Sequence, residues 1–420
     1  MAKTQSLSDR TRFYPVKIAT EMASEIPVNV IKDTGLFGYY GSSCFMDAVN
    51  SRRTKLNISS DEKNTVAIEN DKYFENMMKM TSPTSAKFYQ IDYKDYISGK
   101  TMIKETPKFR LDNKPYNYEG QGNARMWDDI VKRDNSSGVL DWQGDILPNS
   151  LLRSNDLSEM RETYFNDYGL YKVRPLSFDT FTEYGAKVAT CIYYCKKGYT
   201  GPITVQTDVS TYEYDFKKLG FIVTPDTKKE VDFILNCLNM EGYIWKGVKL
   251  KERFFNSKSK EILNSKLFSL TKDNTYKYPV VIKLNKDGTH ELGYTSEIVD
   301  SESIKHDKIV TPYQCSSYAS GGSDLGNVVF IPKGVQLSGS YRWTEVIGNG
   351  DAEISYLQSR PIKYLLQEWR TSQTNDGPQL QIIPKLTDHN VQTEDDILTF
   401  LGGMDIKQEI INGYTRKNIS

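Results

Sequence analysis

Phe109-Arg-Leu-Asp-Asn-Lys-Pro-Tyr116 is the stretch around which the chain is organised, because it combines two candidate hydrogen-bond acceptors with an aromatic ring. The side-chain carbonyl of Asn113 can accept a hydrogen bond from an amino group. Pro115 favours an extended backbone at Lys114, which turns the Lys114 carbonyl outward as a second acceptor. Tyr116 adds a flat face for stacking on a base. Two hydrogen-bond acceptors beside an aromatic ring suit the exocyclic amine of a flipped-out adenine. The alternative interpretation is an ordinary surface turn before a helix.

Two predicted strands of the first half carry acidic side chains at or near their ends. Glu69 lies at the end of one of them, and Asp92 lies within the second, over 88–97. Apolar residues at helical spacing between these strands, as in 72–80, predict alternating strands and helices and therefore a doubly wound α/β sheet. Ligands bind such sheets beyond the carboxyl ends of the strands, so Glu69, Asp92 and Asn113 are expected at one edge. A solvated charge at a strand end is the alternative interpretation for each acid.

Composition limits the classes of function. The 420 residues include 54 basic and 54 acidic side chains, so any nucleic acid must be bound by local basic patches and not by net charge. Five Cys and three scattered His support neither a disulfide framework nor a metal site. No apolar run approaches the ~18–20 residues of a membrane helix, so we expect no membrane partner. The expected location is the cytoplasm, and the composition fits a bacterial or phage-infected cell.

Two domains are expected, an α/β domain over 1–202 and a mixed α/β domain over 203–420 that finds the target. In the second, the stretch 245–260 is basic with interleaved aromatic residues. Its candidate phosphate contacts are Lys246, Lys249, Lys251, Arg253, Lys258 and Lys260. A solvated basic face is the alternative interpretation. Asp287-Gly288 predicts a hairpin, and 356–369 predicts one amphipathic helix.

The order of these motifs resembles that of DNA adenine-N6 methyltransferases of type II restriction–modification systems, in which the cofactor motifs precede a catalytic Asn-Pro-Pro-Tyr motif. Asn113-Lys-Pro-Tyr116 falls at that motif, which implies Asn113, Lys114, Pro115 and Tyr116 as catalytic residues. The resemblance implies a Rossmann-like methyltransferase domain followed by a target-recognition domain. It also implies S-adenosyl-L-methionine (AdoMet) as cofactor and double-stranded DNA as partner.

The resemblance also assigns residues to the cofactor. Phe13–Met22 is similar to the family's N-terminal cofactor-edge helix, which implies a contact from Tyr14. Ala67–Phe74 looks like the second motif, which implies Glu69 on the cofactor ribose, and Asp92 falls where the family has an acid near the cofactor adenine.

The first cofactor motif departs from the family pattern Asp-Pro-x-x-Gly-x-Gly. The matching stretch is Phe37-Gly-Tyr-Tyr-Gly-Ser-Ser43, in which Phe37 replaces the acid, Ser43 replaces the last glycine, and Gly41 remains as the implied cofactor contact. Lys114 likewise replaces the first proline of the catalytic motif. Three hypotheses follow: an active adenine methyltransferase, a noncatalytic DNA-binding subunit beside a partner, and a base-modifying enzyme with another donor.

Overall fold

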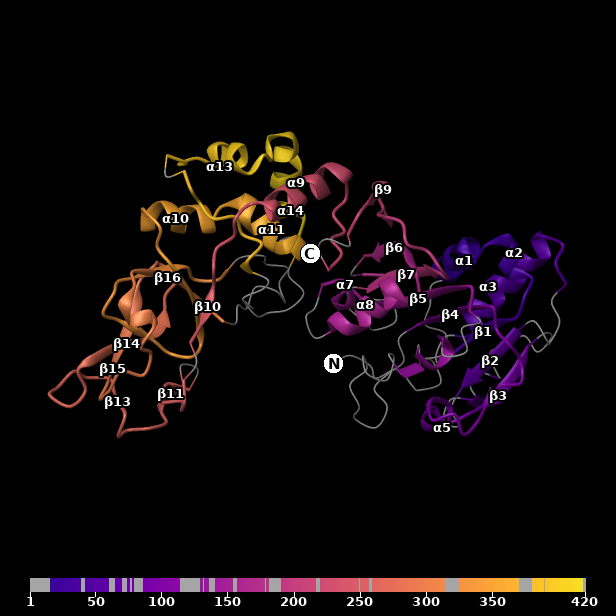
Figure 1. Ribbon diagram of the computed structural model, residues 1–420, viewed down its shortest axis with the longest axis horizontal. Helices are drawn as coiled ribbons and strands as arrows, with labels where there is room; N and C mark the ends of the chain where they lie inside the picture. The colour runs from indigo at the N-terminus through magenta and orange to yellow at the C-terminus, as the bar shows by residue number, and fades with distance from the viewer. Residues whose placement is uncertain are drawn as a thin grey trace. The chain divides into compact units, whose positions relative to one another are not determined.

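The computed structural model (Figure 1) describes residues 16–38, 42–59, 65–69, 74–75, 78, 86–113, 129–130, 132–135, 140–153, 157–177, 179–180, 190–216, 220–248, 250–256, 259–313, 325–369, 380–388 and 390–417. The chain forms two compact units, Met1–Asp226 and Thr227–Ser420. The first unit extends beyond the expected boundary at 202 because β8 (Ile203–Gln206) and β9 (Thr211–Tyr214) pair with strands of its sheet.

The described part of the first unit contains a nine-stranded sheet in the order β3-β2-β1-β4-β5-β7-β6-β8-β9. Its other strands are β1 (Gly35–Phe37), β2 (Thr65–Glu69), β3 (Lys87–Gln90), β4 (Phe109–Asn113), β5 (Trp142–Pro148), β6 (Leu170–Leu176) and β7 (Thr190–Lys196). Strands β1 to β5 are parallel, and β7 runs antiparallel between β5 and β6. The chain adds β2 and β3 on one side of β1 and then returns to add β4 and β5 on the other. The predicted doubly wound, Rossmann-like α/β class is therefore confirmed, with its switch point between β1 and β4.

Helices cover both faces of this sheet (Figure 1). On one face, α1 (Val16–Glu25), α2 (Val28–Ile31) and α3 (Ser42–Lys55) pack against a core that includes Phe37 and Phe109. On the other face, α5 (Tyr93–Ile97) and Ile130 pack against Leu36, Val66 and Ile68. Side chains alternate along a strand, so successive residues of β4 face opposite helical layers.

The predicted strand over 88–97 is wrong beyond Gln90. Asp92 is instead the N-cap of α5, and its side chain accepts a hydrogen bond from the Lys94 backbone N–H at 2.8 Å. Asp side chains favour this cap because it satisfies an amide that the first helical turn leaves open. Tyr93 and Tyr96, three residues apart, then bury their rings on one helical face, where strand alternation would have placed them on opposite faces.

The described part of the second unit is mixed α/β, as predicted. It contains a four-stranded sheet in the order β10-β19-β16-β17, another in the order β13-β15-β14-β18, and the pair β11-β12. Its strands are β10 (Lys246–Gly247), β11 (Phe255–Asn256), β12 (Glu261–Ile262), β13 (Phe268–Ser269), β14 (Tyr278–Leu284), β15 (His290–Thr295), β16 (Lys308–Pro312), β17 (Val329–Ile331), β18 (Gln336–Leu337) and β19 (Tyr341–Glu345). Its helices include α9 (Lys228–Asn239), α10 (Gly350–Leu357), α11 (Arg360–Trp369), α13 (Glu394–Leu401) and α14 (Lys407–Lys417).

Two local predictions in the second unit have different outcomes. The hairpin at Asp287-Gly288 is confirmed: β14 and β15 pair antiparallel, and Gly288 takes a positive φ of 80° in the turn. The single helix over 356–369 is wrong, because α10 ends at Leu357 and α11 begins at Arg360. A continuous helix would require an N–H from Pro361 to the Leu357 carbonyl, and proline has none.

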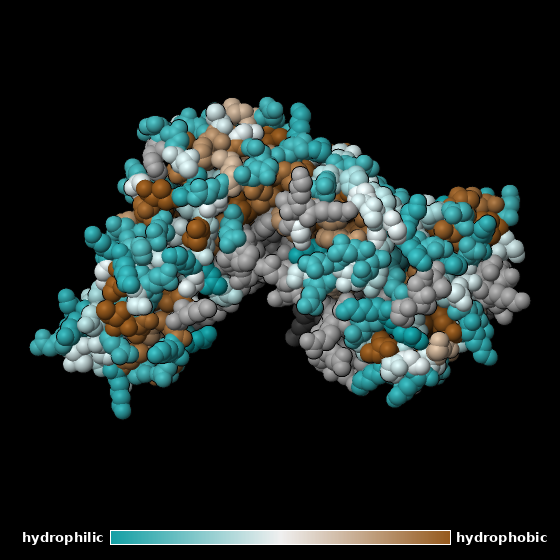
Figure 2. All heavy atoms as spheres, in the orientation of Figure 1, coloured by the Kyte–Doolittle hydropathy of each residue, from teal (hydrophilic) through white to brown (hydrophobic). Residues whose placement is uncertain are grey.

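The surface that faces the viewer in Figure 2 is largely hydrophilic, with apolar groups over β14 and β15. Among the described residues, no helix is long and apolar enough to cross a membrane.

Candidate functional site

The carboxyl ends of the central parallel strands form the candidate site. β1 pairs with β2 on one side and with β4 on the other, with Phe37 opposite both Ala67 and Leu111. The ends of the two neighbouring strands, Glu69 and Asn113, therefore flank the end of β1. Asp92 follows β3 on the same edge. The structure thus brings these polar positions together at the edge where a doubly wound sheet binds its ligands.

The two acidic candidates have different surroundings. Glu69 is 1% exposed, and its backbone carbonyl accepts a hydrogen bond from the Ile91 N–H at 2.9 Å. A ribose would reach the Glu69 carboxylate only after the groups that bury it move aside. Asp92 is half-buried, and its Oδ1 caps α5. Capping fixes the orientation of this carboxylate toward the start of a helix.

Phe37, which replaces the acid of the first motif, is a core residue. It is fully buried and meets Phe109 edge to face, with ring centroids 6.2 Å apart. The Phe37 side chain therefore contributes packing energy at the end of β1 and offers no hydrogen bond to a ligand.

Asp112 places a carboxylate beside the end of β1. A Cβ added to Gly38 would lie 2.1 Å from Asp112 Oδ2, so only glycine fits at position 38 without a shift of this carboxylate. Asp112 is 1% exposed and lies on the face of the sheet opposite to Leu111. Our sequence reasoning missed Asp112, although the alternation along β4 was a signal that could have assigned it to this face.

A buried charge cluster lies on the same face of β4. Arg110 Nη1 donates to Asp134 at 2.7 Å, and Arg110 Nη2 donates to both carboxylate oxygens of Asp145 at 2.7 and 2.8 Å. The hydroxyl of Tyr164 donates to Asp145 at 2.9 Å, and the hydroxyl of Tyr96 donates to Asp134. Side-chain exposure is 0% for Arg110 and Asp145 and 2% for Asp134. The cluster joins β4, β5, α5, α8 (Ser158–Asn166) and the helical residues 132–135 in the interior of the unit.

The arginine of this cluster keeps its charge despite its burial. Burial lowers the pKa of the Arg110 guanidinium, but the adjacent carboxylates of Asp145 and Asp134 raise it further, so the net shift is upward. A charged guanidinium with charge-assisted bonds to two carboxylates is held in a fixed orientation.

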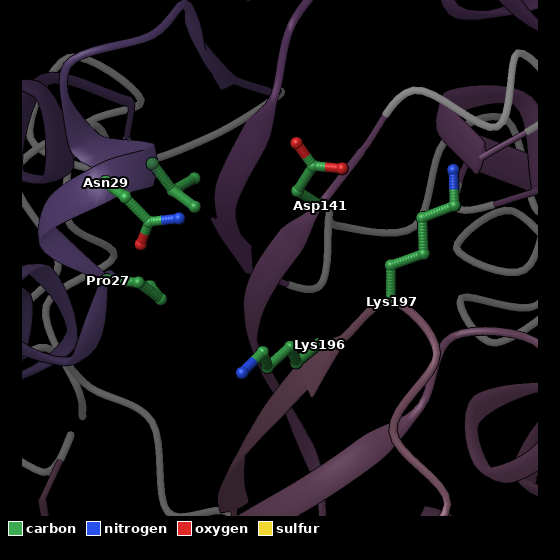
Figure 3. Close-up of a pocket in the computed structure, with 6 residues that line it drawn as sticks. Pro27, Asn29, Asp141, Lys196 and Lys197 are labelled. Carbon is green, nitrogen blue, oxygen red and sulfur yellow. The ribbon is translucent and has the colours of Figure 1, made fainter.

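Figure 3 shows a pocket of the first unit. Asp141 directly precedes β5, and Lys196 ends the antiparallel strand β7, so the pocket lies at the amino edge of the parallel strands. Lys108 Nζ lies 3.8 Å from Asp141 Oδ2 nearby. The lining residues are Pro27, Asn29, Val30, Asp141, Lys196 and Lys197. Because it is at the opposite edge, the pocket is not part of the candidate site.

The basic candidates of the second unit fall into two groups. Lys246 is ion-paired with Glu302 at 2.9 Å and Glu345 at 3.4 Å, and its ammonium lies 4.8 Å from the centroid of the Trp343 ring. A phosphate would compete with two carboxylates for this charge. Lys251, Arg253 and Lys260, which flank or adjoin the hairpin strands β11 and β12, are exposed.

Several predicted site residues fall outside the described part of the chain. They are Tyr14, Gly41, Lys114, Pro115, Tyr116, Lys249 and Lys258, and only the backbone of Asn113 is described. Their assignments stay predictions.

Comparison with known proteins gives structural likeness only. No protein-family model and no curated protein sequence matches the chain. Among solved structures, the ATP-dependent type ISP restriction–modification enzyme LlaBIII bound to DNA is 9% identical, with a TM-score of 0.45 over 94% of this chain and 40% of that one. The type IIL restriction–modification enzyme MmeI in complex with DNA is 8% identical, with a TM-score of 0.44 over 98% of this chain and 73% of that one.

A class I AdoMet-dependent methyltransferase from Listeria monocytogenes, described as putative, matches 48% of this chain and 68% of its own length, with 10% identity and a TM-score of 0.37. The chain covers only 45% of a type I restriction–modification chain and 61% of the type IIG restriction endonuclease BpuSI. These five solved structures are described as restriction, restriction–modification and methyltransferase proteins, and the likeness to them is one of fold.

Proposed function

We propose that the protein is a DNA adenine-N6 methyltransferase-like protein that receives a flipped-out adenine at the end of β4. One observation carries the proposal: Asn113 ends β4 beside the switch point of the sheet, on the edge where Glu69 ends β2. The order of the sequence motifs and the ligand edge of the fold therefore agree.

AdoMet is the proposed cofactor, and its adenosine half would bind at the edge where Glu69 and Asp92 lie. Glu69 ends β2, where its carboxylate could accept hydrogen bonds from both ribose hydroxyls once the groups that bury it move aside. Asp92 lies on the same edge, where it can face the adenine ring. Beside the end of β1, Phe37 offers no acceptor, and the carboxylate present there is that of Asp112. When bound, AdoMet supplies a methyl group on a positively charged sulfur.

The chain's own groups would act on adenine mainly by positioning. The Asn113 side-chain carbonyl and the Lys114 carbonyl accept hydrogen bonds from the two N–H groups of the exocyclic amine, which directs the nitrogen lone pair toward the methyl group. Tyr116 holds the ring by stacking. Bound AdoMet would supply the methyl group by exchanging its S–C bond for the new N–C bond, and the nitrogen would then release a proton to solvent. No strong base is needed, so alignment supplies most of the rate.

A noncatalytic DNA-binding subunit is the second candidate function. The burial of Phe37 in the core favours it, because that position has lost the acid of the first cofactor motif. In this case DNA binding through residues such as Lys251 and Arg253 would remain, and a partner subunit would supply the chemistry.

Calorimetry with AdoMet, with and without an adenine-containing duplex, tests the proposal. Binding that is lost in Glu69→Ala and kept in Glu213→Ala, an exposed β9 residue of the same sheet, supports the methyltransferase. Transfer of a labelled methyl group to unmethylated phage DNA then tests the reaction. No AdoMet binding in either condition would exclude the methyltransferase and leave the noncatalytic subunit and the base-modifying enzyme with another donor.

A further inference from the structure

We infer that Arg110 is a positioning residue for Asn113: bound to Asp134 and Asp145, it fixes the end of β4 against β5 and the helical residues 132–135. The inference rests on the proposed function only in naming Asn113 as a reacting position. The structural coupling is a separate statement and has its own measurement below.

The cluster reaches Asn113 from both sides along the chain. Arg110 lies on β4, three residues before Asn113, and its two guanidinium nitrogens hold carboxylates from different elements. Asp145 belongs to β5 and lies directly opposite Asp112 in the parallel pairing, while Asn113 lies opposite Ile146. The two hydrogen bonds from Arg110 to Asp145 therefore fix the register of β4 on β5 at the pair Asp112–Asp145, one residue before Asn113.

Asp134 connects the helical residues 132–135 to β4. It lies 134 − 113 = 21 residues after Asn113, yet it binds a residue that precedes Asn113. The same helical region is attached to α5 twice, by the hydroxyl of Tyr96 on Asp134 and by the hydroxyl of Tyr93 on Asp129 at 3.2 Å. Asp129 and Asp134 are thereby bonded to α5, and Asp134 is also bonded to β4.

Stability alone is a weak explanation for this cluster. Moving ions from water into a protein interior carries a large desolvation penalty, and a core with apolar residues of similar volume in their place is often as stable. A planar guanidinium group that binds two carboxylates does, however, specify one orientation of the arginine and one register of the two strands. Such a device suits a position three residues from a group whose geometry sets the reaction rate.

Asp134→Asn is the sharpest test. It removes one charge of the cluster while keeping the size and an acceptor oxygen, and the Arg110–Asp145 pair still neutralises the guanidinium. Asp134→Ala is the stronger variant. Glu21→Gln is the matched control, since it weakens the half-buried Glu21–Arg174 ion pair of the same unit, on α1 and β6.

Hydrogen exchange measures the coupling without any substrate. We expect Asp134→Asn to speed amide exchange at 109–113 and 132–135 by about tenfold, with exchange at 190–196 in β7 unchanged, because only the local opening equilibrium shifts. Glu21→Gln should leave 109–113 unchanged. Unchanged exchange in both Asp134 variants, or an equal increase across the whole sheet, would overturn the inference.

Methyl transfer to unmethylated phage DNA gives the second readout. We expect kcat to fall by about 10- to 100-fold in Asp134→Asn, with KM for AdoMet within about twofold of wild type, because a misplaced Asn113 affects alignment and not cofactor affinity. A wild-type kcat in Asp134→Asn would overturn the positioning role. A wild-type protein without any methyl transfer would count against the proposed function, and the exchange measurement would then decide on the coupling.

Discussion

Replacing Gly38 with alanine probes how closely the end of β1 approaches Asp112. The added Cβ would lie 2.1 Å from Asp112 Oδ2, and ordinary contact begins at 3.4 Å, so the atoms must separate by 3.4 − 2.1 = 1.3 Å. Asp112 is 1% exposed and cannot turn into solvent without a larger rearrangement. Overpacking of this kind costs about 1–3 kcal/mol, while alanine recovers about 0.4–1 kcal/mol by restricting the unfolded chain. We expect the free energy of unfolding to fall by about 1–2 kcal/mol.

Urea unfolding followed by circular dichroism measures this loss as a lower midpoint with an unchanged slope. Asp112→Ala removes the carboxylate, so Gly38→Ala should cost at least about 1 kcal/mol less in that background. Gly339→Ala is the control, because its new Cβ would meet Leu250 Cδ1 at an ordinary 3.4 Å. An unchanged midpoint in Gly38→Ala, or the same loss with and without Asp112, would refute the close approach.

Three further predictions concern the second unit. Burial lowers the pKa of Lys308 from 10.5 to about 8, so between these pH values the unfolded state binds more protons than the folded state, and the free energy of unfolding should rise from pH 8 to 10.5. Lys308→Met should flatten this rise when the free energy is measured by urea titration at each pH. An equal rise in Lys308→Met and in the wild type would contradict the prediction. Thr393 accepts from the Asp396 N–H in a capping box, so Thr393→Ala should lower the free energy of unfolding by about 1 kcal/mol, whereas an unchanged urea midpoint would mean that the cap contributes nothing. If the exposed Lys251 and Arg253 contact phosphates, alanine at either position should reduce the slope of the logarithm of the duplex-binding constant against the logarithm of salt concentration by about 1. Lys246→Ala should change this slope less, because Lys246 is already paired with two carboxylates. Equal slopes for all three variants would contradict this difference.

The sheet was predictable because its signals are local. Glu69 ends an apolar run that can be recognised without knowledge of its neighbouring strands, and the turn at Asp287-Gly288 is encoded by two adjacent residues. Asp92 was misplaced because a helix cap and a strand end both favour a polar residue after an apolar run. The choice between them depends on where Tyr93 and Tyr96 find a core, which is a tertiary property.

The buried cluster could not be predicted in the same way. Arg110 and Asp112 alternate with apolar residues along β4, a pattern typical of a strand with one solvated face. Their burial becomes possible only through Asp134 and Asp145, which lie 134 − 110 = 24 and 145 − 110 = 35 residues away from Arg110. No local spacing rule connects residues at such separations. The domain boundary was missed for a similar reason, since β8 joins the sheet by pairing with β6.

The Arg110 cluster has an evolutionary consequence. Loss of either aspartate weakens the neutralisation of a fully buried guanidinium, and loss of the arginine leaves two carboxylates beside each other in the interior. Each single substitution at these positions therefore leaves a buried charge with fewer partners, while a joint replacement by apolar residues of matching volume leaves no buried charge. In the sequences of related proteins, we expect positions 110, 134 and 145 to vary together as one inherited unit, changing in concert or not at all.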